Sequence, residues 1–292
     1  MIAVDAQLIT ESRFGLDGGA MFGIVPRPLW SRKAPPDDAN RISMAANCWL
    51  IDLPGRRVLL DAGMGTRWAE RERDIYAIRQ PGPEPASALR HQGIDPATIT
   101  DVVMTHLHFD HAGGLAGEGP KGETIPLFPD ATCWIQRENW VWAHHPSQRD
   151  SGSYRREDFA WLGGPAAPKL ELLDGVSRIL DDAIEVLPMR GHTPGMQCVR
   201  VQLHGRTWVL CADLIPTRAH LPIPWVMGYD LDPVRSCAEK DELLDQAARH
   251  DWILVLSHEP DLPFITVERD ARGRHGLALE AASVADMLHR LA

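Results

Sequence analysis

The chain has 292 residues, of which 44% are hydrophobic and 24% are charged, so its composition is that of a globular protein that can bury a large core. Its formal net charge of −10 argues against nucleic acid as a partner, because phosphate binding needs a basic face. No signal peptide and no apolar run of about eighteen residues is visible, so we expect no membrane span. Five scattered cysteines without a C-x-x-C pair predict reduced thiols and a cytoplasmic protein.

Two segments rich in glycine and proline are expected to be long loops. The first covers about residues 14–40 and carries Phe22 and Trp30, and the second covers about residues 144–168. Long loops that carry aromatic side chains often form lids or walls of binding sites. We therefore treat both segments as loop insertions in a single domain that spans residues 1–292.

Between and after these loops, short apolar runs alternate with amphipathic segments. Strands are predicted where apolar runs are bounded by turn residues, and helices where apolar side chains recur three or four positions apart. The predicted strands cover residues 47–52, 56–63, 99–106, 131–136, 183–189, 197–203, 206–213 and 252–258. The predicted helices cover residues 86–92, 138–143, a segment that begins near Pro233, and residues 279–291. This mixture predicts an α/β fold with helices outside the sheets.

The densest group of metal-binding side chains lies at the end of the third predicted strand, in the sequence THLHFDHAGG. Alternate side chains of a strand point the same way, so His106 and His108 can hold one ion together. The chain must then turn before Asp110 and His111 can face a second ion. The two glycines that follow permit that turn and let other backbone approach closely. Burying Asp110 among histidines without a cation would be costly, so we expect a metal site.

Three further predicted strands deliver a metal-capable side chain close to their carboxyl ends. These side chains are His192, Asp213 and His258. Sites gather in the loops at the edge of a sheet, and four strands that end alike are hard to explain by packing. Imidazole and carboxylate donors without thiolate suit zinc, and also iron, manganese or cobalt.

Aromatic side chains in the first loop and in the segment HLPIPWVMGYD are expected to form an apolar rim above the metals. The candidate substrate-binding residues are Phe22, Trp30, His220, Trp225 and Tyr229. Such a rim favours a small-molecule substrate with an apolar arm: a lactone, a carboxylic ester or an organophosphate triester. The alternatives are that these aromatics pack the loops or form a homodimer contact, and that His220 is a surface histidine.

The metal-binding segment resembles the His-x-His-x-Asp-His signature of the metallo-β-lactamase superfamily. Further elements of that superfamily are similar, in the same order, to LLDAG at 59–63, GHTPG at 191–195, AD at 212–213 and SH at 257–258. The resemblance covers about residues 45–260. It implies a four-layer αββα sandwich that holds two divalent metal ions. We expect these ions to be zinc, with iron, manganese or cobalt as the alternatives.

The resemblance also implies a role for each candidate ligand. The implied ligands are His106, His108 and His192 for the first ion, Asp110, His111 and His258 for the second, and Asp213 as a bridge between both. Asp61 is expected to brace the site from behind the ligands, with a turn or cap role as the alternative.

Within the superfamily, the string HLHFDHAGG is similar to that of N-acyl-homoserine lactonases and of methyl parathion hydrolase-like enzymes. The lactonases place a tyrosine three residues after the bridging aspartate, where this chain has Pro216. Tyr229 or Tyr154 would have to take the part of that tyrosine. The antibiotic-hydrolysing members lack Asp213 in this form, which argues against hydrolysis of β-lactams.

Two cations about 3.5–4 Å apart can hold and activate one water molecule between them. In the predicted reaction, a metal-bridging hydroxide attacks the scissile carbonyl or phosphoryl group. Asp110 orients this hydroxide or accepts its proton. One alternative is a glyoxalase II-like thioesterase, which needs a basic patch that this sequence does not show. A second is a di-iron redox protein, which would carry an extra carboxylate in the cluster. A third is a binding protein without activity, against which the complete ligand set argues.

Overall fold

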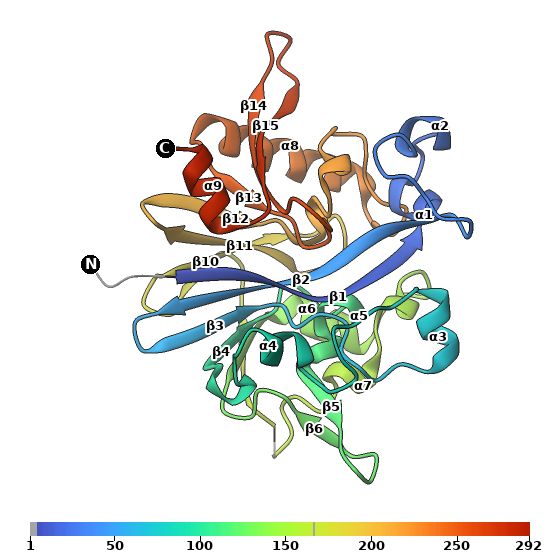
Figure 1. Ribbon diagram of the computed structural model, residues 1–292, viewed down its shortest axis with the longest axis vertical. Helices are drawn as coiled ribbons and strands as arrows, with labels where there is room; N and C mark the ends of the chain where they lie inside the picture. The colour runs from blue at the N-terminus through green and yellow to red at the C-terminus, as the bar shows by residue number, and fades with distance from the viewer. Residues whose placement is uncertain (1–4, 166) are drawn as a thin grey trace. The chain divides into compact units, whose positions relative to one another are not determined.

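The computed structural model describes residues 5–165 and 167–292. The chain divides into two compact units, each of which holds a sheet and helices (Figure 1). Unit 1 comprises Met1–Phe14 and Ala45–Gly175, and unit 2 comprises Gly15–Met44 and Val176–Ala292. Both units mix strands and helices, as the α/β prediction requires. No helix in the described part of the chain is long and apolar enough to cross a membrane.

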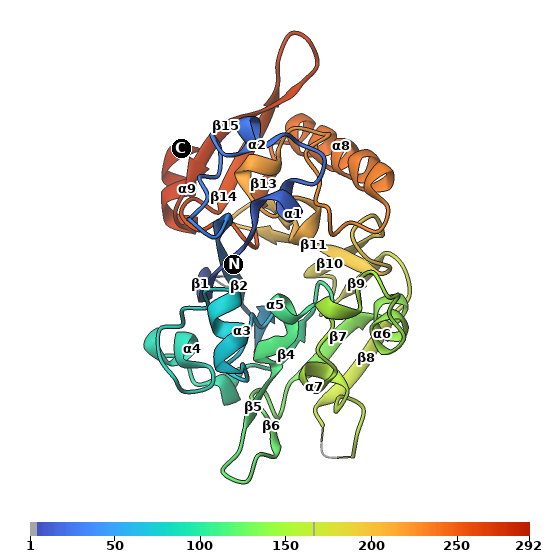
Figure 2. The same cartoon turned by 90° about the vertical axis from the view of Figure 1, so that its right-hand side faces the viewer.

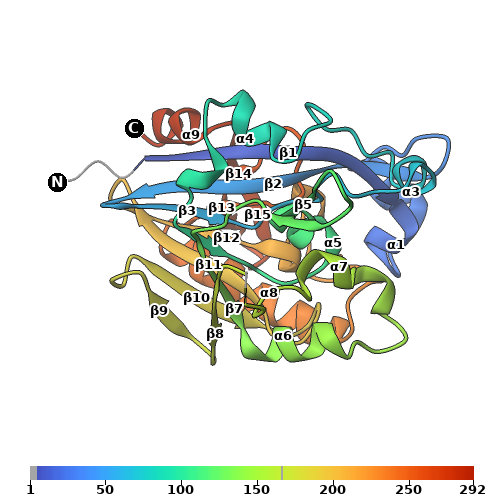
Figure 3. The same ribbon diagram turned by 90° about the horizontal axis from the view of Figure 1, so that it is seen from below.

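Unit 1 is built on a six-stranded sheet in the order β1-β2-β3-β4-β7-β8. Its strands are β1 (Asp5–Asp17), β2 (Arg41–Leu53), β3 (Arg56–Leu60), β4 (Asp101–Val103), β7 (Thr132–Gln136) and β8 (Lys169–Leu173). The long strands β1 and β2 run side by side (Figure 3), and residues 15–17 and 41–44 at their far ends belong to unit 2. Strands β3, β4, β7 and β8 are parallel, so the carboxyl ends of β3 and β4 reach the same edge of the sheet.

Short helices and a small hairpin complete unit 1. They are α3 (Glu70–Ile75), α4 (Ser87–His91), η1 (Pro96–Thr98), α5 (Phe109–Ala112), η2 (Gly113–Leu115), α6 (Arg137–His144), η3 (Ser151–Ser153), α7 (Arg156–Phe159) and the pair β5 (Ala116–Glu118) and β6 (Thr124–Pro126). The β5–β6 hairpin extends away from the helices (Figure 2). Leu59, Val102 and Cys133 of the sheet share one apolar core with Leu89 of α4 and Phe159 of α7.

Unit 2 is built on a seven-stranded sheet in the order β15-β14-β13-β12-β11-β10-β9. Its strands are β9 (Ser177–Ile179), β10 (Ile184–Met189), β11 (Met196–Leu203), β12 (Arg206–Leu210), β13 (Ile253–Val255), β14 (Phe264–Arg269) and β15 (His275–Ala281). Neighbouring strands are antiparallel apart from β12 and β13, which are parallel. The ends of β12 and β13 therefore also meet at one edge.

Unit 2 also contains several helical elements. They are α1 (Gly18–Phe22), α2 (Arg27–Trp30), η4 (Ala212–Leu214), η5 (Arg218–His220), α8 (Pro233–Arg249) and α9 (Val284–Arg290). The long helix α8 begins at Pro233 after the capping residue Asp232, whose side chain accepts a hydrogen bond from Arg235 N. It lies against the sheet (Figure 1) and buries Leu244 and Ala247 in one core with β12, β13 and β14.

Each predicted strand overlaps an observed strand, and the predicted helices at residues 86–92, 138–143 and from Pro233 are confirmed as α4, α6 and α8. The last predicted helix is wrong at its start, because residues 279–281 belong to β15 and the helix begins after Ser283, whose hydroxyl caps it. Strands β1, β5, β6, β8, β9, β14 and β15 are not among the predicted strands. In β1 polar and apolar residues alternate irregularly, and β5, β6 and β9 have only three residues each.

The two segments expected to be loops contain short helices. Residues 14–40 continue β1 as far as Asp17 and then form α1 and α2. Residues 144–168 contain η3 and α7. In the first segment glycine and proline mark the boundaries of single helical turns, with Gly23 after α1 and Pro26 before α2.

The two glycines at the end of the metal-binding motif serve close packing. Gly113 has an ordinary helical φ of −58°, so the expectation that it provides a special turn is wrong. A Cβ atom on Gly113 would lie 2.0 Å from the carbonyl oxygen of Met64, and one on Gly114 would lie 2.0 Å from that of Ala62. Gly114 N also donates to the carbonyl of Gly63 at 3.0 Å. The expected close approach of backbone is therefore present.

Replacing Gly114 by alanine is expected to lower the free energy of unfolding by about 1–3 kcal/mol, because the added methyl group collides with backbone that is fixed by hydrogen bonds. Chemical denaturation of the variant measures this loss. Gly152→Ala is the matched control, since nothing lies within 4 Å of the carbon that it adds. Equal stability of the two variants would contradict the packing argument.

Candidate metal centre

The histidine-rich motif of unit 1 follows β4 as a short connection to α5. Strand β4 ends at Val103, so the expectation that His106 and His108 project from a strand is wrong. Their ring nitrogens nevertheless converge, with His106 Nε2 3.0 Å from His108 Nδ1. His108 is the extended residue before α5, and Leu107 N donates to Asn139 Oδ1 at 3.0 Å. The hydrogen bond to Asn139 of α6 thus helps to fix the backbone of this connection, although it is not part of a strand.

Asp61 organises the same motif from the end of the neighbouring strand β3. Its Oδ1 accepts a hydrogen bond from Thr105 N at 2.7 Å, and its Oδ2 accepts one from Thr105 Oγ1 at 2.8 Å. Oδ2 also lies 2.8 Å from His111 Nδ1. A proton held on Nδ1 by this carboxylate makes Nε2 the lone-pair nitrogen of a neutral His111. Asp110 is buried beside it, with Oδ1 3.9 Å from that Nε2.

Three candidate ligands of unit 2 gather at one edge of its sheet. His192 follows β10, Asp213 lies in η4 after β12, and His258 follows β13. Asp213 Oδ2 lies 3.2 Å from His192 Nε2, and Asp213 Oδ1 lies 2.9 Å from His258 Nε2. One carboxylate therefore faces two histidine rings, with a different oxygen toward each.

A fourth buried residue, Asp230, fixes the ring of His192. Its Oδ1 lies 2.9 Å from His192 Nδ1, which makes Nε2 the lone-pair nitrogen of a neutral ring. Asp230 is the last residue of the segment HLPIPWVMGYD and lies 38 positions from His192 in the sequence. No local sequence pattern indicates that it is a partner of His192.

The donor atoms in unit 2 fit a metal ion. With its proton on Nδ1, His192 presents an acceptor nitrogen to an acceptor oxygen of Asp213 at 3.2 Å. Two acceptors at this distance need a cation between them, either a metal or a second proton on the ring. Metal–nitrogen and metal–oxygen bonds of about 2.0–2.2 Å would span this separation. Nitrogen and oxygen donors without sulfur fit zinc, iron, manganese or cobalt.

Four of the five predicted rim residues, Phe22, Trp30, His220 and Trp225, gather in unit 2 as an aromatic cluster. The ring of Phe22 stacks on His220 with centroids 4.5 Å apart, stacks on Trp30 at 5.3 Å, and meets Trp225 edge-on at 5.8 Å. Phe22, Trp30 and His220 are buried, Trp225 is half-buried, and Tyr229 is exposed. Phe22 and Trp30 thus form the inner layer of the cluster, and Trp225 lies toward its surface.

His220 is a buried packing residue, so the alternative of a surface histidine is wrong. Its Nε2 donates to the carbonyl of Met21 at 2.9 Å, and its Nδ1 accepts from Thr217 Oγ1 at 2.8 Å. Burial lowers the pKa of His220 to about 3. The ring is therefore neutral at physiological pH and ties η5 to α1.

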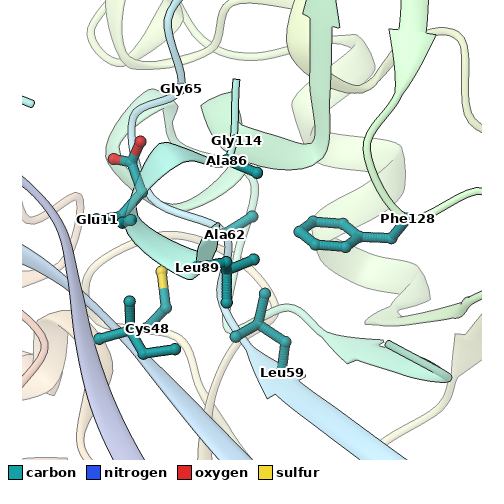
Figure 4. Close-up of a pocket in the computed structure, with 11 residues that line it drawn as sticks. Glu11, Cys48, Leu59, Ala62, Gly65, Ala86, Leu89, Gly114 and Phe128 are labelled. Atoms are coloured by element: carbon teal, nitrogen blue, oxygen red, sulfur yellow. The ribbon is translucent and has the colours of Figure 1, made fainter. Parts of the chain in front are cut away.

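A small cavity lies in unit 1 between β1, β2 and α4 (Figure 4). The carboxyl group of Glu11 and the thiol of Cys48 line it together with apolar side chains. Met64 N donates to Glu11 Oε2 at 3.0 Å, and burial raises the pKa of Glu11. With a volume of about 20 Å³ the cavity is of the size that one water molecule needs. The cavity is too small for a substrate. The Glu11 carboxylate that lines it holds the turn at Gly63 and Met64 through the hydrogen bond from Met64 N.

Comparisons with known proteins agree with this geometry. Residues 43–118 match the metallo-beta-lactamase superfamily. The N-acyl homoserine lactonase AttM of Rhizobium radiobacter is 28% identical over 230 residues, which cover 73% of this chain and 81% of that protein.

Solved structures share the fold over almost the whole chain. A probable metal-dependent hydrolase from Staphylococcus aureus is 25% identical, with a TM-score of 0.85 and 96% of each chain covered. AidC, a dizinc quorum-quenching lactonase solved with its product, is 21% identical, with a TM-score of 0.76 and 95% of each chain covered. The chain therefore has the metallo-β-lactamase fold that its motifs predict, and that prediction is confirmed.

Replacing Asp230 by asparagine is expected to weaken metal binding about 10- to 100-fold. An amide can donate as well as accept, so it no longer fixes which nitrogen of His192 carries the proton. Competition with a chromophoric chelator measures the affinity. Asp232→Asn is the matched control, since asparagine keeps the helix cap at that position. Unchanged affinity in Asp230→Asn would show that the Asp230 carboxylate does not support a metal ligand.

Proposed function

We propose that this chain, with its metallo-β-lactamase fold, is a dinuclear metal-dependent hydrolase whose preferred substrate is a lactone with an apolar arm. The observation that carries the proposal is the placement of Asp213. Its two carboxylate oxygens face His192 and His258 separately, and the resemblance assigns those two histidines to different ions. A carboxylate in this position is suited to bridge a pair of cations.

We further propose the ligand assignment that the resemblance implies. His106, His108 and His192 would hold one ion, Asp110, His111 and His258 the other, and Asp213 both. Support comes from the geometry within each unit, where the donors are buried and carboxylates orient His111 and His192. A pair of zinc ions is the first choice, in line with the description of AidC as a dizinc enzyme.

When bound, the two ions would supply an activated water molecule and an electrophile for the scissile carbonyl. The residues of the chain supply orientation and proton transfer. Asp61 and Asp230 would keep the rings of His111 and His192 aimed, and Asp110 would hold the nucleophile or accept its proton. Tyr154 would take the part of the lactonase tyrosine that Pro216 replaces. Its ring packs 4.5 Å from that of His108, whereas Tyr229 lies exposed at the rim.

A lactone is favoured over the other substrates by two relatives. AttM is named as an N-acyl homoserine lactonase, and AidC was solved with a homoserine product. The aromatic cluster of unit 2 offers an apolar surface through Trp225, which Phe22 supports. We propose that Trp225 and the exposed Tyr229 contact the substrate, and that Phe22, Trp30 and His220 form the layer beneath Trp225. Carboxylic esters and organophosphate triesters are further substrates that the same chemistry would accept.

Purified protein is expected to contain about two metal ions per chain and to open N-acyl-homoserine lactones faster than it cleaves a p-nitrophenyl ester, a phosphotriester or a thioester. Elemental analysis and a pH-indicator assay measure both quantities, and a chelator should abolish turnover until metal is restored. Turnover of the thioester alone would overturn the proposal in favour of a thioesterase. A metal-loaded protein that is inactive on all four substrates would also overturn it. Light scattering of the same sample tests the expected homodimer.

His108→Ala is expected to lose metal and to lower turnover by more than the roughly 100-fold loss typical for an outer partner of a ligand. His289→Ala, which removes an exposed histidine of α9, is the matched control and should keep both. Circular dichroism checks that the fold survives. If His108→Ala keeps full turnover, the reaction takes place elsewhere on the protein.

A further inference from the structure

Helix α8 carries a fully buried lysine whose hydrogen bonds all go to backbone carbonyl groups. Lys240 is 0% exposed, and its Nζ donates to the carbonyl oxygens of His220 at 3.0 Å, Pro222 at 3.1 Å and Trp225 at 2.8 Å. An ammonium group has three donors, so the three carbonyls match its full capacity. Lysine is almost never fully buried unless it is paired, so this arrangement requires an explanation.

The segment that Lys240 binds has few hydrogen bonds of its own. Residues 220–225 read HLPIPW, and prolines at 222 and 224 lack the N–H group that would pair with a neighbouring carbonyl. One turn is closed locally, by Trp225 N donating to the carbonyl of Pro222 at 2.9 Å. The remaining carbonyls need a donor from outside the segment, and an ammonium group at the end of a long, thin side chain can reach several of them at once.

Burial works against the charge of this lysine. Removal from water lowers the pKa of Lys240 to about 8, while the nearby Cys237 and Asp230 act in the opposite direction. The amine is therefore still mainly protonated at pH 7. A charged group retained at this cost, against carbonyl dipoles alone, occupies the position that a bound cation would take among convergent carbonyl oxygens.

The segment held by Lys240 carries part of the aromatic cluster. His220 stacks on Phe22 and bonds to the carbonyl of Met21, and Trp225 meets the edge of Phe22. One turn earlier on the same face of α8, Cys237 Sγ lies 3.4 Å from the carbonyl of Ile223. Helix α8 thus fixes the segment, and the segment fixes α1.

We propose that Lys240 is a positioning residue whose ammonium group acts as an internal cation, fixing residues 220–225 and through them the aromatic wall that receives the apolar arm of the substrate. This inference rests on the proposed function for its catalytic consequence. Its structural part, the ordering of residues 220–225, holds independently of any reaction. Loss of the ammonium group should make residues 220–225, and with them His220 and Trp225 of the aromatic cluster, more mobile. The candidate metal ligands should stay in place.

Lys240→Met, which keeps the length of the side chain but not its donors, is expected to raise KM about 10-fold for a long-chain N-acyl-homoserine lactone. Its kcat and metal content should stay within about two-fold of the parent protein, and KM for a short-chain lactone should change little. Lys121→Met, at an exposed lysine in the β5–β6 turn, is the matched control. An equal loss of kcat on long and short substrates would overturn the inference, because it indicates a general structural defect.

Two further measurements do not depend on activity. In Lys240→Ala, hydrogen exchange of residues 220–228 should speed up, and ethylammonium should restore both the protection and the KM while tetramethylammonium, which has no donor, should not. In the parent protein, the 15Nζ signal of Lys240 should appear as a slowly exchanging ammonium at pH 7. An unchanged exchange pattern in the variant would overturn the inference. A rapidly exchanging amine in the parent protein would also overturn it, even if no variant folds.

The outcomes separate the two proposals. If the parent protein opens no lactone but Lys240 orders residues 220–225, the proposed function fails and the structural inference stands. If lactones are opened and Lys240→Met behaves as the parent protein does toward both chain lengths, the proposed function stands and the inference fails.

Discussion

Pairing of a buried carboxylate with the Nδ1 atom of a buried histidine is the interaction on which the candidate metal centre depends. Such pairs join Asp61 and His111 in unit 1 and Asp230 and His192 in unit 2. An imidazole has one proton to place when neutral, so the carboxylate behind the ring decides which nitrogen faces the site. Without these partners the rings could rotate or change tautomer, and the converging donors would lose their common direction.

Parallel strand pairs bring residues of the candidate site together in both units. In unit 1, parallel β3 and β4 bring Asp61 and Thr105 to one edge of the sheet, where they are joined by two hydrogen bonds. In unit 2, parallel β12 and β13 bring Asp213 and His258 together in the same way. Residues more than 40 positions apart thus meet because their strands run in one direction and end at one level.

This rule explains what the sequence could predict. An apolar run that ends in histidine or aspartate can be recognised in the sequence alone, so the candidate ligands and Asp61 could be predicted. Asp230 could not, because it lies in a connection whose path depends on how α8 packs. The helical φ of Gly113 and the burial of His220 were missed for a related reason. Both depend on which backbone from a distant part of the chain lies alongside.

Helix α8 links the ligand loop of unit 2 to the aromatic cluster through two successive residues. The Glu239 carboxylate accepts hydrogen bonds from the N–H groups of Arg190 and Gly191, just before His192. A Cβ atom on Gly191 would lie 2.4 Å from Ser236 N, so the loop can lie directly on the helix only because residue 191 is glycine. Lys240, the next residue after Glu239, holds the rim segment through carbonyl groups. A carboxylate that binds N–H groups and an ammonium that binds carbonyls fix both segments to one rigid element, so any shift of α8 would move the ligand and the rim together.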